Sequence, residues 1–182
     1  MNNAGWGVPS PLDEADYQDL ENMVNLNIGP YVYLTRALLP RMLKREKRSG
    51  IIFNGSIAAA FVSPSMSIYS GSKAFVDHFT KCLAYENPNK IDVLSYKPNM
   101  VETNLVKIKS SFFVLTPTEA ANSALDKLGW DVETEGHWRH ACLNAKMRAK
   151  RSVLPERVSM EISNKRMRQF AEMIKGANRN KA

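Results

Sequence analysis

Apolar residues recur along the chain with two different periods, and these predict both helices and strands. Between residues 20 and 39 they fall at three- and four-residue steps, which is typical of a helix with one buried face. Residues 50–56 contain a short apolar run and residues 91–96 alternate, so both segments are predicted to be strands. A further apolar stripe predicts a helix over residues 69–85, and we expect the last strand at residues 136–140.

The apolar face of the helix at residues 20–39 is interrupted by one polar residue, Asn27. Pro30 has no N–H to donate to the carbonyl of Leu26, and its ring crowds that position, so we expect a kink beside Asn27. A polar residue on a buried face needs a partner, and a carbonyl freed by a kink can hold an ordered water.

Thr116, Pro117 and Glu119 predict the start of another helix. A threonine cap, a proline at the first helical position and a glutamate three residues after the cap form the capping-box pattern. We expect this helix to run to about Trp130.

The composition bounds the class of protein. At 182 residues with 44% hydrophobic content, the chain is long enough for one domain with a sizeable core, and disorder is not expected. Two cysteines, Cys82 and Cys142, make no disulfide framework, which indicates a reducing compartment. No apolar run approaches the roughly 20 residues that span a bilayer, and the N-terminus has no signal-peptide pattern. We therefore expect a chain that neither spans a membrane nor carries a signal peptide.

No metal site is predicted. His137 and His140 lie near Cys142, but a strand would place the two histidines on opposite faces, and no carboxylate cluster completes a ligand set.

The positive charge is concentrated at the C-terminus. Residues 139–182 hold 12 Lys and Arg against 3 Asp and Glu, whereas residues 1–138 hold 13 against 15. We divide the chain into a body at residues 1–142 and a basic tail of one or two amphipathic helices at residues 143–182. The tail has three interpretations: a solvated helix covering the body, contact with an anionic membrane surface, and nucleic-acid binding. The last is the least favoured, because the chain shows no nucleic-acid-binding fold signature.

Tyr69 and Lys73 are the first candidates for chemistry. They are four residues apart, so on a helix their side chains share one face. A phenol ordinarily has a pKa near 10, and a neighbouring cation favours the phenolate and lowers that pKa. Tyr69 is then suited to exchange a proton with a substrate oxygen near neutral pH. Ser56 adds a second hydroxyl, because a strand end followed by a loop and a helix can bring it to the same oxygen.

These residues stand in register with Asn27, with the Asn-Asn-Ala-Gly turn of residues 2–5 and with residues 98–103, and the combination resembles the short-chain dehydrogenase/reductase family. The resemblance covers roughly residues 1–140. It implies an α/β fold, namely the C-terminal portion of a Rossmann-like doubly wound parallel sheet, with a basic helical tail. The first half of that fold, with its glycine-rich phosphate-binding turn, is expected to be absent from this chain.

The resemblance also assigns roles to the catalytic set Ser56, Tyr69, Lys73 and Asn27. In that family the tyrosine protonates the carbonyl oxygen, the serine hydrogen-bonds it, and the lysine lowers the tyrosine pKa and binds the cofactor ribose. The backbone carbonyl of the asparagine holds a water linked to the lysine. The residues that the resemblance places beside the cofactor are Asn3, Ala4, Gly5, Tyr69, Lys73, Pro98, Val101 and Thr103. Asn99 stands where the family commonly has glycine.

The Tyr-Ser-Gly-Ser-Lys-Ala-Phe-Val segment at residues 69–76 resembles the branch of 17-beta-hydroxysteroid dehydrogenases and very-long-chain 3-oxoacyl-CoA reductases. That implies an oxidoreductase moving a hydride between NADP(H), rather than NAD(H), and a keto or hydroxy group of a lipid-like substrate. The substrate would be a 3-oxoacyl-CoA of fatty acid elongation or a steroid. It also implies a location on the endoplasmic reticulum membrane surface, contacted through the basic tail.

Two further regions have counterparts in the family. The helix at residues 69–85 corresponds to a dimer contact, so a homodimer is expected. Residues 107–115 correspond to a substrate loop, and their apolar side chains suit a lipid-like substrate as well as they suit packing on the core.

Two alternatives stay open. One is a truncated, non-catalytic relative that acts as a binding or scaffolding protein, because the loss of several strands would leave a sheet edge and apolar surface uncovered. The other is a membrane- or nucleic-acid-binding module led by the tail. Without a signal peptide or a spanning segment, a cytoplasmic location is the alternative to the membrane surface.

Overall fold

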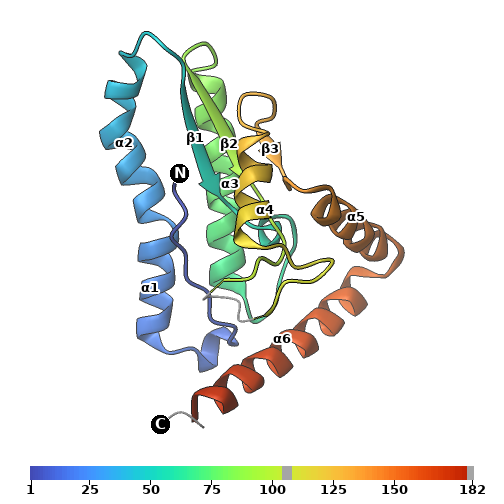
Figure 1. The fold of residues 1–182 in the computed structure, drawn as a ribbon. Coiled ribbons are helices and arrows are strands. Elements are labelled where there is room, and N and C mark those ends of the chain that lie inside the picture. The colour runs from blue at the N-terminus through green and yellow to red at the C-terminus, as the bar shows by residue number, and fades with distance from the viewer. Residues whose placement is uncertain (104–107, 180–182) are drawn as a thin grey trace.

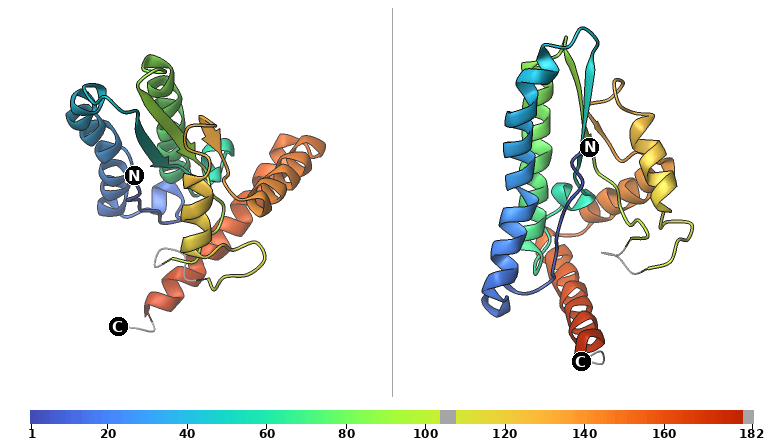
Figure 2. Two further views of the ribbon diagram at one scale, coloured as in Figure 1. Left: turned by 45° about the horizontal axis from the view of Figure 1, so that its top comes forward. Right: turned by 60° about the vertical axis from the view of Figure 1, so that its left-hand side comes forward.

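A parallel sheet lies between two layers of helices (Figures 1 and 2). The computed structural model describes residues 1–103 and 108–179, with side chains as far as Glu172. Within this part of the chain the named strands are β1 (Ser49–Asn54), β2 (Ile91–Tyr96) and β3 (Glu133–Thr134), in the order β1-β2-β3. Asn2 pairs with β1 on the edge away from β2, since its N–H donates to the Ile52 carbonyl at 2.9 Å. The α/β fold with a parallel sheet is therefore confirmed.

The helices divide between the two faces of the sheet and its end. On one face lie α1 (Tyr17–Asn27), α2 (Gly29–Leu43) and α3 (Ser67–Glu86), and α4 (Pro117–Leu125) lies on the other. Next to the end toward which β1 and β2 point lie α5 (Trp138–Val153) and α6 (Glu156–Arg179) (Figure 1). Two short 3-10 helices, η1 (Leu12–Glu14) and η2 (Ile57–Ala60), lie in the connecting loops.

Both faces of the sheet are buried. Phe53 and Val93 pack with Tyr31 and Val76 from the helices on one face, and the Tyr31 and Phe53 rings lie 5.6 Å apart. Neighbouring strand residues point the other way, where Ile52, Leu94 and Tyr96 pack against Ala124 of α4. A parallel strand covered on both sides reads as a continuous apolar run, which is the pattern at residues 51–53.

The predicted kink beside Asn27 is confirmed. The helix α1 ends at Asn27 and α2 begins at Gly29, with Ile28 between them at φ −118°. Pro30 lies in the first turn of α2, where its missing N–H costs no helical hydrogen bond. The break therefore follows from local sequence.

The other elements of the body are confirmed with shifted ends. The helix α3 begins two residues before Tyr69, and β2 has the predicted bounds. The full capping box at Thr116 and Glu119 starts α4, but the helix ends at Leu125 rather than near Trp130.

The prediction of a strand at residues 136–140 is wrong. The last strand is β3 at Glu133–Thr134, and Gly136 has φ +74°, which favours glycine and ends the extended chain. The His137 side chain then accepts the Arg139 N–H as the cap of α5. The histidines therefore do not lie on opposite strand faces, and the helix α5 begins at Trp138.

The tail is attached to the body by polar contacts. The Ser65 hydroxyl donates to Asn164 of α6 at 2.8 Å, and Arg168 lies 3.3 Å from Glu14.

None of the helices in the described part of the chain combines the length and apolar character that a membrane-spanning segment needs. The expected tail residues Met173 and Ile174 lie outside the side chains that the structure describes.

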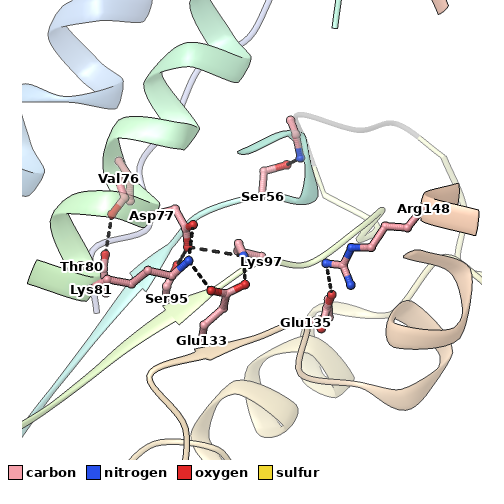
Figure 3. A network of polar contacts seen from close by, with 11 residues as sticks. Ser56, Val76, Asp77, Thr80, Lys81, Ser95, Lys97, Glu133, Glu135 and Arg148 are labelled. Atoms are coloured by element: carbon pink, nitrogen blue, oxygen red, sulfur yellow. Dashed lines mark hydrogen bonds and ion pairs between the residues drawn. The ribbon is translucent and has the colours of Figure 1, made fainter. Parts of the chain in front are cut away.

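A buried ionic network joins α3 to the last two strands (Figure 3). Lys97, 3% exposed, directly follows β2 and pairs with Glu133 of β3, and it lies 3.5 Å from Asp77 of α3. Lys81 pairs with the same two carboxylates, and Ser95 donates to Asp77 at 2.6 Å. Burial alone would raise the pKa of Asp77, but the hydrogen bonds from Ser95 and Lys81 and the charge of Lys97 outweigh it and hold that pKa below its ordinary value.

Replacing Lys97 tests how much this network contributes to the stability of the fold. We expect Lys97→Met to lower the free energy of unfolding by about 3 kcal/mol, because two carboxylates lose a buried counterion. The matched control is Lys127→Met, whose exposed pair with Asp131 at 3.6 Å should contribute less than about 1 kcal/mol. Urea unfolding measures both, and equal effects would mean that Lys97 contributes no more than a surface pair.

Candidate active site

Ser56 and Tyr69 meet where β1 ends. Ser56 lies two residues beyond β1 and caps η2, with its Oγ accepting the Ala58 N–H at 3.1 Å. Tyr69 lies in the first turn of α3, and its hydroxyl is close enough to Ser56 for that side chain to lower the Tyr69 pKa. Two hydroxyls from separate elements can therefore reach one substrate oxygen.

Gly7 packs against the Tyr69 ring. A Cβ built on Gly7 would lie 2.7 Å from the ring's Cδ2, closer than non-bonded carbon atoms approach. A larger residue here would therefore displace the tyrosine.

Lys73 is one turn further along α3, and it is only 3% exposed. Its Nζ donates to the Asn54 carbonyl at 2.9 Å and lies 5.8 Å from the ring centroids of both Tyr69 and Tyr31. Burial lowers the pKa of Lys73 to about 8. Because Asn54 accepts one of the three N–H bonds of the ammonium, others remain for a ligand.

The pKa of Tyr69 shifts in the direction opposite to that predicted. Burial raises this pKa above its ordinary value, and the hydrogen bond with Ser56 offsets the shift only in part. In this arrangement Tyr69 is a protonated donor at neutral pH, which is the form needed to protonate a developing alkoxide.

Asn27 joins the N-terminal segment to the helices. Its side chain is fully buried, accepts the Trp6 N–H at 2.8 Å and donates to the Trp6 carbonyl at 2.8 Å. The same amide donates to Ser72 at 3.1 Å, and Ser72 donates to the Tyr69 carbonyl at 2.7 Å. Asn27 therefore supports the chain on both sides of the tyrosine, whereas Asn25 is exposed.

Tyr31 falls on the face that periodicity predicts to be apolar in the helix at residues 20–39, but it is a polar member of the site. Its hydroxyl donates to the Asn54 carbonyl at 2.9 Å, the acceptor that Lys73 also uses, and lies 3.4 Å from the Ala4 carbonyl. Its position four residues after Asn27, on the same face of the helix predicted from the sequence, was the available signal. Asn54, one residue before Gly55 at the strand end, was missed as well.

The Asn3-Ala4-Gly5 turn is close to the lysine. Asn3 accepts a hydrogen bond from the Asn54 amide at 2.6 Å, and a Cβ on Gly5 would lie 3.4 Å from Lys73 Nζ. The structure therefore brings this turn together with Asn27, Lys73 and the end of β1.

The segment after β2 is held more loosely to the site. The Pro98 carbonyl accepts the Ile57 N–H at 3.1 Å, next to Ser56. Val101 pairs with Leu115, and Thr103 is exposed. Lys107, the first residue of the expected substrate loop, lies outside the described residues.

His140, which in the sequence suggests only a possible metal ligand, supports this segment. It is fully buried, its Nδ1 accepts the Asn99 N–H at 3.1 Å, and its Nε2 lies 3.2 Å from the Met100 carbonyl. Asn144 on the same helix accepts from the Asn99 amide at 2.8 Å. Within the described residues no group of three or more His, Cys, Asp or Glu is placed to hold a metal ion.

The sequence model described as "short chain dehydrogenase" matches residues 1–112. The chain belongs to the short-chain dehydrogenase family. It is 36% identical over 177 residues to the very-long-chain 3-oxoacyl-CoA reductase of Anas platyrhynchos, covering 93% of this chain and 55% of that protein. It is 33% identical over 150 residues to hydroxysteroid dehydrogenase-like protein 1 of Gallus gallus, covering 78% and 45%. The chain thus spans about half the length of the curated relatives it matches.

A solved structure supports the fold. The chain superposes on the 3-ketoacyl-(acyl-carrier-protein) reductase from Brucella melitensis, complexed with NADH, with a TM-score of 0.63 and 26% identity, covering 71% of this chain and 58% of that one. Structural neighbours of this kind are Rossmann-fold dehydrogenases, which confirms the predicted fold class.

The residues present fit one end of a nicotinamide dinucleotide. Lys73 retains N–H donors, Gly5 leaves room beside them, and the buried Asn54 Oδ1 has no hydrogen-bond partner. These groups suit ribose hydroxyls, which both donate and accept.

Asn27→Ala should destabilise the protein by about 3 kcal/mol, because the Trp6 amide and carbonyl and Ser72 all lose a buried partner. Asn25→Ala, on the exposed face of the same helix, should change the stability by no more than about 0.5 kcal/mol. Urea unfolding of both variants measures this, and a similar small effect at both positions would contradict the support role of Asn27.

Lys73 should make the stability depend on pH. The Lys73 pKa of about 8 in the folded protein lies below the lysine pKa in the unfolded chain. At pH values between these two pKa values the unfolded state binds more protons, so the free energy of unfolding rises with pH. Relative to Lys73→Met, the wild type should gain about 2 kcal/mol between about pH 7 and about pH 9.5. Thermal unfolding of both proteins across this range tests the sign, and parallel profiles would show that Lys73 is not desolvated.

Proposed function

We propose that the protein is a reductase that transfers a hydride from NADPH to the keto group of a 3-oxoacyl-CoA with a long acyl chain. The observation that carries the proposal is the convergence of Ser56, Tyr69 and Lys73 at the end of β1. Family membership and relatives named as very-long-chain 3-oxoacyl-CoA reductases support it.

The chain's own residues manage the charge that develops on the substrate oxygen. As the keto carbon is reduced, that oxygen becomes an alkoxide, and Tyr69 donates its proton there while Ser56 hydrogen-bonds the same atom. The Tyr69 pKa, raised by burial, keeps the phenol protonated and ready to donate. The buried Lys73 ammonium then stabilises the phenolate that remains, because charge interactions are strong in a desolvated site.

The nicotinamide cofactor, when bound, supplies the hydride. Lys73 and the Asn3-Ala4-Gly5 turn would hold its ribose, and Asn54 would accept from a ribose hydroxyl. The choice of NADPH over NADH rests on the resemblance to the 3-oxoacyl-CoA reductase branch. A water at the kink carbonyl beside Asn27 would return a proton to Tyr69 through Lys73.

The apolar surface supports a lipid-like substrate. Phe112, Phe113 and Trp138 are exposed, and the Phe112 ring packs edge to face with the other two, at centroid distances of 4.9 Å to Phe113 and 5.8 Å to Trp138. They lie next to the segment after β2, where an acyl chain could pass. A steroid would bury apolar surface in the same way, so it is the competing substrate.

The location and assembly form part of the same proposal. Exposed apolar residues on the outer helix faces, including Leu34, Leu38 and Phe75, suit a homodimer. The basic tail suits contact with the anionic surface of the endoplasmic reticulum membrane.

Tyr69→Phe should reduce the rate of NADPH oxidation with a long-chain 3-oxoacyl-CoA by about 10²- to 10⁴-fold, since it removes the proton donor. The control is Tyr33→Phe, which removes a hydroxyl from a residue that is 76% exposed and should leave the rate unchanged. The assay follows the loss of NADPH absorbance, with NADH in a parallel arm.

Nucleotide binding separates the alternatives. Binding of NADPH that Lys73→Met weakens, together with turnover that Tyr69→Phe abolishes, would support the reductase. A folded chain that binds neither nucleotide would overturn the proposal and favour a non-catalytic scaffold.

A further inference from the structure

A pocket opens between η2 and the two C-terminal helices, next to the site described above. It has a volume of about 270 Å³. The apolar part of its lining consists of Ile57, Phe61, Met147, Leu154, Ile162 and Met167. Since small-molecule sites typically measure roughly 300–1,000 Å³, this pocket can hold a short segment of an apolar chain rather than a whole large ligand.

The pocket shares a wall with the reacting hydroxyls. Ile57 directly follows Ser56, and the Ala58 N–H donates to the Ser56 Oγ at 3.1 Å. Ser56 in turn lies near the Tyr69 hydroxyl, whose pKa it lowers. A ligand in the pocket therefore contacts Ile57, the residue that directly follows Ser56, and so lies beside the place where Tyr69 would protonate a substrate oxygen.

Three cations also line the pocket: Lys150 and Arg151 from α5 and Arg166 from α6. Lys150 and Arg166 are exposed and so stand at its rim. Within the described part of the chain, none of the three has an ion pair with an acid.

Several other cations of the same helices form ion pairs, although Lys146 and Lys165, outside the pocket, have none among the described contacts. The pairs are Arg148 with Glu135, Arg157 with Glu161 and Arg168 with Glu14. The positive charge at the pocket is therefore left available for an anion.

Arg151 is held in place for such a role. Its guanidinium lies 4.5 Å from the Phe61 ring centroid, and both Nη atoms donate to the Val62 carbonyl at 3.2 Å. Two of its five N–H groups are used in this way, and three remain. An arginine fixed by stacking loses little side-chain freedom when it binds a phosphate.

We propose that this pocket binds an amphiphile made of an acyl chain and a phosphate-bearing head. The chain lies on the apolar lining, and the phosphate lies on Lys150, Arg151 and Arg166. Building on the proposed function, the ligand is the acyl-CoA substrate, whose coenzyme carries the phosphates. The headgroup of an anionic phospholipid has the same chemistry and is the competing source.

The test is binding of palmitoyl-CoA, below its micelle concentration, to the purified chain by calorimetric titration. Coenzyme A alone and palmitate alone should each bind at least about tenfold more weakly, because each lacks one half of the recognised structure. The double variant Lys150→Glu with Arg166→Glu should weaken palmitoyl-CoA binding by more than about tenfold.

The matched control is Lys146→Glu with Lys165→Glu, which makes the same charge change on the same two helices outside the pocket lining. For the apolar part, Ile162→Trp should obstruct the pocket, whereas Val158→Trp, exposed on the same helix but outside the lining, should not. Equal losses in a pocket variant and its control would overturn the proposal.

Vesicles distinguish the two sources. Phosphatidylcholine vesicles with and without phosphatidic acid are offered to the wild type and to both double variants. If the pocket variant loses vesicle binding but no variant affects palmitoyl-CoA, the lipid headgroup is the source and the assignment to the substrate is overturned.

Nucleotide titration keeps this proposal separate from the proposed function. Specific palmitoyl-CoA binding in a chain that binds neither NADPH nor NADH would support the pocket while overturning the reductase. Nucleotide binding without specific palmitoyl-CoA binding would overturn the pocket alone.

Discussion

The structure around the site depends on the hydrogen bond that the buried Lys73 ammonium requires. A charged group that is 3% exposed needs an acceptor, and the acceptor is the Asn54 carbonyl at the end of β1. Tyr31 donates to the same carbonyl, and the backbone at Gly5 comes close enough that only a small residue leaves the ammonium room. The position of the lysine charge, and with it the environment of Tyr69, is therefore set by a strand end.

The loops that form the site are supported by buried polar side chains of the helices. Asn27 bonds both backbone groups of Trp6, and His140 contacts the backbone of Asn99 and Met100. Buried amides and imidazoles make strong, directional hydrogen bonds because water does not compete. Loops held in this way keep their geometry without being core elements themselves.

Charge is distributed unevenly over the C-terminal helices, and this distribution carries more information than the net value. Arg148 and Arg168 attach these helices to acids of the body. Lys150, Arg151 and Arg166 instead line a pocket beside Ser56. Some cations of the tail thus pair with acids of the body, and others line the pocket without such a pair in the described part of the chain.

The sequence by itself determined the elements whose signals are local. Periodicity predicted β2 and α3, Pro30 and Asn27 predicted the helix break, and the capping box predicted the start of α4. The combination of Ser56, Tyr69 and Lys73 with Asn27 and with residues 2–5 and 98–103 resembled the family. Only the tertiary structure decided the remainder, because it depends on packing between distant segments. Burial raises the Tyr69 pKa, and residue spacing does not reveal burial. The Tyr31 hydroxyl serves the site because folding brings it to the Asn54 carbonyl. Residues 136–140 form a turn and a helix because Gly136 packs against Tyr96 with a positive φ.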